Sequence, residues 1–505
     1  MSHQSQKTKL HSIMLALSFL TLSCMSIARA QPWEQNHKLL ASDGTEFDFF
    51  GTSVAVSGNL AVIGALNDDD NGFSSGSAYV LDVTTGNQLF KLLPFDGALG
   101  DNFGTSVALS ENLAVIGALE DNDNGFGSGS AYVFDITTGQ QLFKLLPSDV
   151  EARDNFGTSV AFSENLAVIG AAGDGDNGFN SGSAYVFDIT TGNQLFKLLP
   201  SDGAADDRFG FSVALSGNTA VIGALGDDDN GPASGSAYVF DVTTGNQLFK
   251  LLPSDGATDD QLGISVAVSG NTAVIGARFD DDNGFNSGSA YVYDVTTGQQ
   301  LFKLLPSDGA GGDSFGSSVA LSGNTAVIGA DFDDDNGSAY IFDVTTGQQL
   351  FKLLPSDGAE ANFFGTSVAL SGNLAVIGAD YDDDNGSGSG SAYVFEPRLT
   401  NYLAVEPFPL LASQDGTFSL VQGLPDETSW LLYSTDGLGK TLINQLNVTV
   451  DIANPKIALG PGLTDANGDR QVRRRIPTVT EPMDIWFQAV QHNNVTNFFR
   501  TQIVP

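Results

Sequence analysis

Short apolar runs and turn residues alternate with a regular period along most of the chain. In the first repeat unit the apolar or alternating runs cover residues 53–57, 60–65, 77–83 and 88–93. Ser57-Gly58-Asn59 and Thr84-Thr85-Gly86 separate neighbouring runs and are typical of tight turns. No stretch with a helical period occurs in these units. The pattern therefore predicts four antiparallel strands per unit.

The second predicted strand differs from the others because it is apolar on both faces. Its sequence is Leu60-Ala61-Val62-Ile63-Gly64-Ala65. A strand without polar alternation is buried on both sides, as in a sheet packed between two neighbouring sheets. Its small residues suit a crowded position close to the axis of a ring.

The unit occurs seven times, and a Phe-Gly or Leu-Gly pair marks the start of each copy. Five steps between these pairs are 53 residues and the sixth is 49. The first residues of the pairs are Phe50, Phe103, Phe156, Phe209, Leu262, Phe315 and Phe364. A long fixed period means that stacked or ring-arranged units bury their apolar faces against each other. Four strands in about 50 residues is the size of a β-propeller blade.

The two ends of the repeat region distinguish a closed ring from an open superhelix. Residues 35–44 align without gaps to residues 88–97, which form the fourth strand of a blade, while the last copy stops after its third strand at Phe395. The N-terminal strand therefore completes the last blade. We predict an all-β fold, a seven-bladed β-propeller of four-stranded blades closed by the N-terminal strand.

A lysine falls at the same fourth-strand position of every blade. These residues are Lys38, Lys91, Lys144, Lys197, Lys250, Lys303 and Lys352. The fourth strand is the outer strand of a propeller blade, and lysine on an outer strand opposes edge-to-edge aggregation. We interpret the row as structural.

The sequence predicts three segments. Residues 1–30 have a signal-peptide pattern, with Lys7 and Lys9 before a short apolar stretch and Ala28-Arg29-Ala30 at the cleavage site. Residues 31–397 form the propeller, and residues 398–505 have strand signals that favour a small β-sandwich-like domain. The competing interpretation of the first segment is a disordered cytosolic N-terminus. The signal peptide predicts a protein that is secreted, or located at the cell surface or in the periplasm, and that starts near Gln31.

Charge and cysteine content narrow the classes of partner. The chain has a formal net charge of −39, and residues 31–397 hold 10 basic against 50 acidic side chains. Such a surface repels nucleic acid and anionic lipid and attracts cations. The apolar stretch near the N-terminus is too short for a membrane span. Cys24 is the only cysteine, so the mature chain has no disulfide and no thiolate metal site.

The repeated residues resemble a known family. Phe-Gly at the start of a unit followed by Val-Ile-Gly-Ala, as at Phe50-Gly51 and Val62–Ala65, resembles the FG-GAP repeats of integrin alpha-chain propellers and of their bacterial relatives with a DDDNG loop. The resemblance implies a seven-bladed propeller used for extracellular binding or adhesion. In integrin-type repeats the calcium loop lies between FG and GAP. Here that position holds only Ser-Gly-Asn or Ser-Glu-Asn, so the integrin calcium ligands do not carry over. A weaker similarity links residues 294–302 to quinoprotein propeller repeats.

A D-x-D-N-G pattern is the strongest candidate for chemistry, and it occurs in all seven units. Its aspartates are Asp68, Asp70, Asp121, Asp123, Asp174, Asp176, Asp227, Asp229, Asp280, Asp282, Asp333, Asp335, Asp382 and Asp384. Alternate carboxylates in a Gly-ended loop can converge on one hard cation. We therefore predict these residues as calcium ligands. The competing interpretation is a turn held by hydrogen bonds from Asx side chains.

The linker between blades carries a second acid pair, which begins with Asp43 and Asp48 in the first unit. Strand alternation places this linker and the D-x-D-N-G loop on the same face of the ring. The pattern predicts one intensely acidic face. Because the units differ just beside the D-x-D-N-G cores, we expect a partner to be recognised there, with calcium bridging to it or ordering the loops.

Catalytic constellations are missing from the pattern. The mature chain has two histidines, His37 and His492, and neither falls in a repeat loop. The departures from the repeat form no reactive set in the sequence; they are Arg153, Arg208, Arg278, Pro232, Asp331 and Asp380. We expect a secreted, non-enzymatic binding or adhesion protein whose partner is an extracellular protein or glycan. The alternatives are a quinoprotein-like or carbohydrate-active propeller enzyme, and a structural surface-layer protein.

Overall fold

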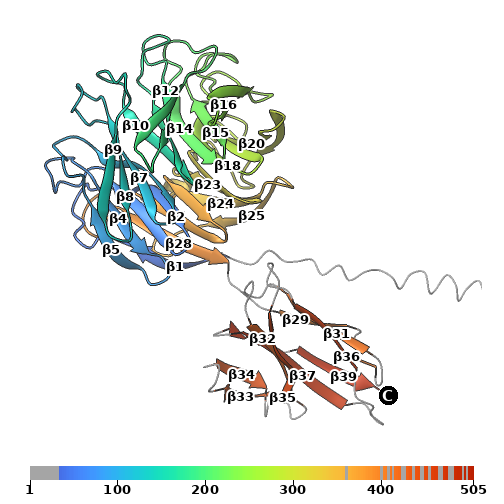
Figure 1. Ribbon diagram of the computed structural model, residues 1–505. Coiled ribbons are helices and arrows are strands. Elements are labelled where there is room, and N and C mark those ends of the chain that lie inside the picture. Colours follow the sequence, from blue (N-terminus) through green and yellow to red (C-terminus); the bar gives the residue numbers. More distant parts are fainter. Residues whose placement is uncertain are drawn as a thin grey trace, which may run out of the picture. The chain divides into compact units, whose positions relative to one another are not determined.

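The chain divides into two compact units, one of which runs from Pro32 to Arg398 while the other includes residues 399–505. The computed structural model describes residues 33–358 and 362–397, apart from the side chain of Asp335, and the strand backbone between residues 402 and 504. The predicted signal peptide lies outside the described residues. Figure 1 shows the unit from Pro32 to Arg398 as sheets arranged around a common centre.

Each blade is a four-stranded antiparallel sheet with its strands in sequence order. The first blade consists of β2 (Phe50–Ser57), β3 (Leu60–Ala65), β4 (Ser77–Asp82) and β5 (Asn87–Leu92). The second consists of β6 (Phe103–Ser110), β7 (Leu113–Ala118), β8 (Ser130–Asp135) and β9 (Gln140–Leu145). The third consists of β10 (Phe156–Ser163), β11 (Leu166–Ala171), β12 (Ser183–Asp188) and β13 (Asn193–Leu198). The fourth consists of β14 (Phe209–Ser216), β15 (Thr219–Ala224), β16 (Ser236–Asp241) and β17 (Asn246–Leu251).

The remaining blades follow the same plan. The fifth consists of β18 (Leu262–Ser269), β19 (Thr272–Ala277), β20 (Ser289–Asp294) and β21 (Gln299–Leu304). The sixth consists of β22 (Ser318–Ser322), β23 (Thr325–Ala330), β24 (Ser338–Asp343) and β25 (Gln348–Leu353), and its shortened loop holds the 3₁₀ turn η1 (Asp333–Asp335). The seventh contains β26 (Val368–Ser371), β27 (Leu374–Ala379) and β28 (Ser391–Pro397).

The N-terminal strand β1 (Trp33–Leu39) completes the seventh blade by pairing antiparallel with β28. Lys38 lies opposite Tyr393, in the same register that places Lys91 opposite Tyr79 in the first blade. The predicted seven-bladed, all-β propeller and its closure by the N-terminal strand are confirmed. The closure leaves no blade with an unpaired third strand.

The core of the propeller lies between adjacent blades. Val62 and Val80 of the first blade share a buried cluster with Ile116 and Tyr132 of the second. At the closure, a corresponding cluster joins Val394 of the seventh blade to residues of the first. The second strand is buried on both faces, as its continuous apolar sequence predicts.

Hydrogen bonds from serine side chains hold neighbouring blades in register. Ser53 Oγ donates to the carbonyl oxygen of Gly104 in the next blade at 2.7 Å. The corresponding bond across the closure runs from Ser367 Oγ to the Gly51 oxygen at 2.7 Å. This close approach requires glycine in the second strand, because a Cβ at Gly64 would lie 2.0 Å from the Gly104 oxygen.

The described backbone of the C-terminal unit consists of strands. One sheet has the order β29 (Tyr402–Glu406), β31 (Asp415–Val421) and β36 (Arg470–Arg475). A second has the order β30 (Leu410–Leu411), β39 (Phe499–Val504), β37 (Met483–Gln491), β32 (Thr428–Ser434) and β35 (Lys456–Leu463), with β38 (Asn494–Val495) paired to β37. β33 (Leu438–Ile443) and β34 (Val448–Ile452) form a hairpin. Their packing as a β-sandwich stays a prediction.

Candidate functional site

The D-x-D-N-G loops and the linkers between blades lie on one face of the ring, which we call the loop face. The amide of Phe103 bonds the Ser75 oxygen at 3.0 Å, and the amide of Asn102 bonds the Ser74 oxygen at 3.2 Å. These bonds join the linker that enters the second blade to the D-x-D-N-G loop of the first. The predicted placement of both acidic segments on the same face is therefore correct.

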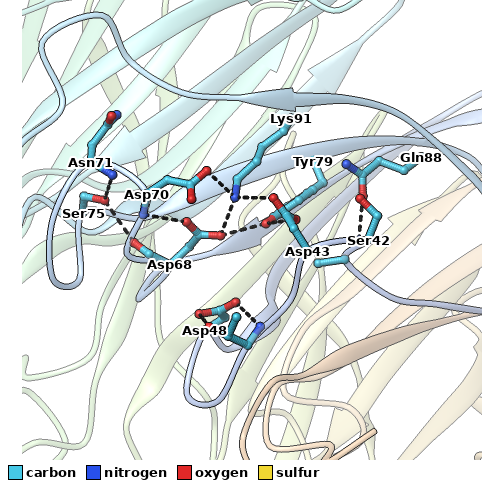
Figure 2. A network of polar contacts seen from close by, with 12 residues as sticks. Ser42, Asp43, Asp48, Asp68, Asp70, Asn71, Ser75, Tyr79, Gln88 and Lys91 are labelled. Carbon is cyan, nitrogen blue, oxygen red and sulfur yellow. Dashed lines mark hydrogen bonds and ion pairs between the residues drawn. The ribbon is translucent and has the colours of Figure 1, made fainter. Parts of the chain in front are cut away.

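A lysine lies among the carboxylates of each loop, as Figure 2 shows for the first blade. Lys91 Nζ is 2.8 Å from Asp68 Oδ2, 2.7 Å from Asp70 Oδ2 and 2.9 Å from Asp43 Oδ2. Asp68 and Asp70 belong to the D-x-D-N-G loop, and Asp43 comes from the preceding linker. We call this arrangement the lysine triad, after the three aspartates that contact one lysine.

The lysine triad recurs in every blade. The other six groups are Lys144 with Asp96, Asp121 and Asp123; Lys197 with Asp149, Asp174 and Asp176; Lys250 with Asp202, Asp227 and Asp229; Lys303 with Asp255, Asp280 and Asp282; Lys352 with Asp308, Asp333 and Asp334; and Lys38 with Asp357, Asp382 and Asp384. In every blade but the sixth, the structure thus brings together the two aspartates that the D-x-D-N-G pattern predicted. In the sixth blade, Lys352 contacts Asp333 and Asp334. The side chain of Asp335 lies outside the described residues.

The first aspartate of each loop is the buried centre of the triad. Asp68 is 3 % exposed, and its Oδ2 accepts a hydrogen bond from the Tyr79 hydroxyl at 2.7 Å. Its Oδ1 accepts the amide of Asp70 at 3.1 Å. Burial lowers the pKa of Lys91, but its hydrogen bonds to the three aspartates outweigh burial and the pKa is raised. The lysine is therefore held in its charged form.

The sequence-based explanation of the lysine row was wrong in its physical reason. The side chain of Lys91 is only 15 % exposed and points into the triad rather than outward from an open sheet edge. The row is structural, as predicted, because it neutralises carboxylates that would otherwise repel each other on the loop face.

These residues do not fit a calcium ion as they are arranged. Calcium requires six to eight oxygen ligands around a common centre, whereas the point shared by the three carboxylates is occupied by the Lys91 ammonium group. Among residues 33–358 and 362–397, no group of three or more acidic or histidine side chains is arranged to hold a metal. Calcium binding at the fourteen aspartates stays a prediction, and the lysine would have to leave before it could occur.

Comparison with known proteins places this architecture in a family. The FG-GAP repeat model matches residues 33–81, 87–134, 140–187, 193–240, 246–293, 299–342 and 348–395. The chain belongs to the FG-GAP repeat family. Each matched segment begins in the outer strand of one blade and ends in the third strand of the next, so the family's repeat spans the blade boundary.

Two further comparisons add little to the FG-GAP assignment. A europium-containing methanol dehydrogenase is similar in structure, with a TM-score of 0.40 and 11% sequence identity over 72% of this chain and 93% of that chain. A likeness this distant carries no argument about function. The comparison with curated proteins found no match.

Within the described residues of the FG-GAP protein, no helix has the length and hydropathy to cross a membrane.

The second aspartate of each linker has a different role in the FG-GAP propeller. Asp101 Oδ2 accepts the amide of Ala98 at 2.7 Å, which closes the linker into a tight loop. Burial raises the pKa of this carboxyl to about 6. Burial likewise raises the pKa values of Asp154, Asp207 and Asp260 to about 6. In the seventh blade Asn362 takes the equivalent position and donates to Asp382 Oδ2 at 3.0 Å.

Exposed phenylalanines follow the D-x-D-N-G cores of four blades. They are Phe73, Phe126, Phe179 and Phe285, which are 71 %, 69 %, 66 % and 78 % exposed. Sequence analysis expected a partner beside these cores because the units differ there, whereas the phenylalanine itself is shared by these four units. The structure shows that its ring is exposed to solvent in each of them.

Three of the residues that depart from the repeat lie at equivalent positions of neighbouring blades. Arg278, Asp331 and Asp380 follow the second strands of three successive blades, and burial raises the pKa of Asp380 to about 7, with the Asp331 charge adding to the effect. Nearby rings extend from Phe332 through Phe363 to Tyr381, with centroids 5.0 and 4.8 Å apart. The sequence missed this gathering because it depends on which loops face each other across blade boundaries.

Proposed function

We propose that the protein is a secreted, non-enzymatic binding module that docks a partner protein on its loop face. The observation that carries the proposal is the row of exposed rings at Phe73, Phe126, Phe179 and Phe285. Binding residues lie disproportionately on loops that a rigid scaffold positions. Aromatic side chains are also enriched at protein interfaces.

The charge of the loop face defines the partner's chemistry. Each triad holds three carboxylates against one ammonium group, so the surface beside the rings stays acidic. A partner surface with apolar pockets for the rings and basic side chains around them complements this face. Adhesion through such contacts does not require calcium as a bridge.

Location outside the cytoplasm is part of the same proposal. It rests on the signal-peptide pattern of residues 1–30, with Ala28-Arg29-Ala30 at its end. Detection of a mature chain that starts near Gln31 in the culture medium, the periplasm or the surface fraction tests it.

The docking proposal is tested with the purified mature chain on arrays of extracellular proteins and glycans. We expect binding to proteins with basic and apolar surfaces, and at least a tenfold loss when the four phenylalanines are changed to serine. The matched control changes Leu89, Leu142, Leu195 and Leu301 to serine, because these leucines are 45–46 % exposed in the outer strands of the same four blades. Equal loss in both variants, or binding to glycans alone, would contradict the proposed docking surface.

A further inference from the structure

A pocket of about 310 Å³ opens at the loop-face ends of the second, third and fourth blades. Its lining includes Glu120 after β7, Ala172 and Gly173 after β11, and Arg208 and Phe211 at the start of β14. Its volume lies at the lower end of the range for small-molecule sites. It is therefore large enough for a small organic ligand.

Three departures from the repeat create this pocket. Ala172 stands where the first, second and fourth blades have Leu66, Leu119 and Leu225, so the third blade lacks the leucine side chain that these blades have, and Gly173 replaces Asn67 and Glu120 of the first two. Arg208 replaces the asparagines Asn102 and Asn155 of the preceding blades, and Phe211 replaces Thr105 and Thr158. Because a repeat protein needs none of these changes for its fold, their convergence on one cavity points to a ligand.

The charges that line the pocket are opposite and are not paired with each other. Among the described residues, the Arg208 guanidinium has no ion pair or side-chain hydrogen bond, whereas each repeat lysine contacts three aspartates. Glu120 Oε1 accepts only a long hydrogen bond from Asn155 Nδ2, at 3.4 Å. Both Arg208 and Glu120 line the same cavity. A ligand with one negative and one positive group would pair with both.

The charge of the whole propeller favours a ligand with no net charge. Residues 31–397 hold 10 basic and 50 acidic side chains, and this field repels small anions. A simple cation would gain nothing from Arg208. A zwitterion meets neither difficulty, because its carboxylate suits the planar guanidinium and its ammonium group suits Glu120.

We propose that this pocket binds a free α-amino acid with an apolar side chain. Its carboxylate contacts Arg208, its ammonium group contacts Glu120, and its side chain packs against Phe211 and Leu119. Asn155 and Thr158 supply further polar groups to the lining. The lining includes Asn180, which follows Phe179 of the docking surface, but the inference rests on the cavity and its charges and does not depend on the proposed function.

The test is isothermal titration of the full mature chain with L-leucine, N-acetyl-L-leucine, L-leucine methyl ester and D-glucuronate. The N-acetyl compound lacks the ammonium charge, and the methyl ester lacks the carboxylate. We expect L-leucine to bind, and each modified compound and D-glucuronate to bind at least tenfold more weakly. Failure of L-leucine to bind, or tighter binding of an anion or of the ester, would overturn the proposal.

Three variants locate the site. Arg208→Gln and Glu120→Gln should each weaken L-leucine binding at least tenfold. Ala172→Leu should abolish it by filling the pocket, and this variant should fold because Leu66, Leu119 and Leu225 occupy the same position in other blades. Arg153→Gln is the matched control, since Arg153 is exposed and does not line the pocket. Unchanged binding by folded Ala172→Leu, or equal loss in Arg153→Gln, would place the binding elsewhere and contradict the inference.

Discussion

Lys38 and Asp382 are 344 residues apart in the sequence, and Lys38 Nζ lies 2.9 Å from Asp382 Oδ2 in the folded chain. The equivalent contact in the first blade, between Lys91 and Asp68, spans only 23 residues. The last blade therefore makes through long-range closure the contacts that the first blade makes locally. Loop closure over this separation costs more conformational entropy, so we expect the last blade to be the final one to form.

Removing residues 31–41 tests this closure. The truncation removes β1, one of the two partner strands of β28, and exposes Ala392 and Val394, which are fully buried in the closed ring. We expect the melting temperature to fall by at least about 5 °C, because loss of a paired strand costs several kcal/mol. Thermal unfolding followed by circular dichroism measures the change.

Lys38→Ala is the control for the truncation, since it removes the triad cation of the seventh blade and keeps the strand. We expect it to resemble Lys197→Ala, the same change in the third blade. A truncated protein that melts like Lys38→Ala would show that strand pairing contributes nothing to closure.

The lysine triads predict a specific response to calcium. Because Lys91 and its equivalents already neutralise the carboxylates, the melting temperature of the unmodified protein should be the same in chelator and in millimolar calcium at constant ionic strength. Lys197→Ala should lose about 2–3 kcal/mol of stability, at or below the lower end of the range of about 3–5 kcal/mol for breaking a buried ion pair, since two of its three carboxylates are half-exposed.

The same variant frees Asp149, Asp174 and Asp176 to bind a cation. We therefore expect calcium to raise the melting temperature of Lys197→Ala while leaving the unmodified protein unchanged. A clear rise for the unmodified protein would instead support the calcium sites predicted from the D-x-D-N-G pattern.

Stability should depend on pH through two sets of aspartates with opposite signs. Burial raises the pKa values of Asp101, Asp154, Asp207 and Asp260 to about 6, so their contribution is present at low pH and is lost as the pH rises through 6. For the triad aspartates Asp43, Asp202 and Asp255, burial raises the pKa, but the paired lysine lowers it by more, so the net shift is downward. The stability that these three aspartates contribute is therefore lost on acidification. Melting temperatures should therefore rise from pH 8 to about pH 5 and fall below about pH 4.

A fourfold change of Asp101, Asp154, Asp207 and Asp260 to asparagine isolates the first set. Asparagine occurs naturally at this position as Asn362, so the variant should fold. We expect most of the rise between pH 8 and pH 5 to disappear, with a smaller part left from Asp380 and the other buried aspartates with raised pKa values, and the loss at low pH to remain. A variant that keeps the full rise would assign it to other groups.

Gly64→Ala tests the close approach of adjacent blades. The added Cβ would lie 2.0 Å from the Gly104 oxygen, which is a backbone atom that cannot move without separating the blades. We expect a loss of about 3 kcal/mol or more in chemical denaturation. Gly58→Ala is the control, because Gly58 has a φ of 55° and open space around it, and should cost only about 1 kcal/mol. Similar losses in both variants would indicate that backbone strain, rather than blade contact, decides the effect.

The sequence alone was sufficient to predict the blades and their closure. The strands follow from patterns within about ten residues, and the repetition of Val-Ile-Gly-Ala in seven units and of Thr-Thr-Gly in six removes the ambiguity of a single short segment. The alignment of residues 35–44 with residues 88–97 identified the strand that completes the last blade. These features are predictable because local periodicity and repetition determine them.

Only the tertiary structure showed which of the recurring charged residues of the repeat contact each other. Lys91 and Asp43 are 48 residues apart and belong to different parts of the repeat, and they meet because the register of β4 and β5 directs the lysine toward the loop face. The pocket that holds Arg208 likewise depends on side chains from three blades. Sequence periodicity describes each strand separately, whereas these sites are formed by contacts between loops that the packing of neighbouring blades brings together.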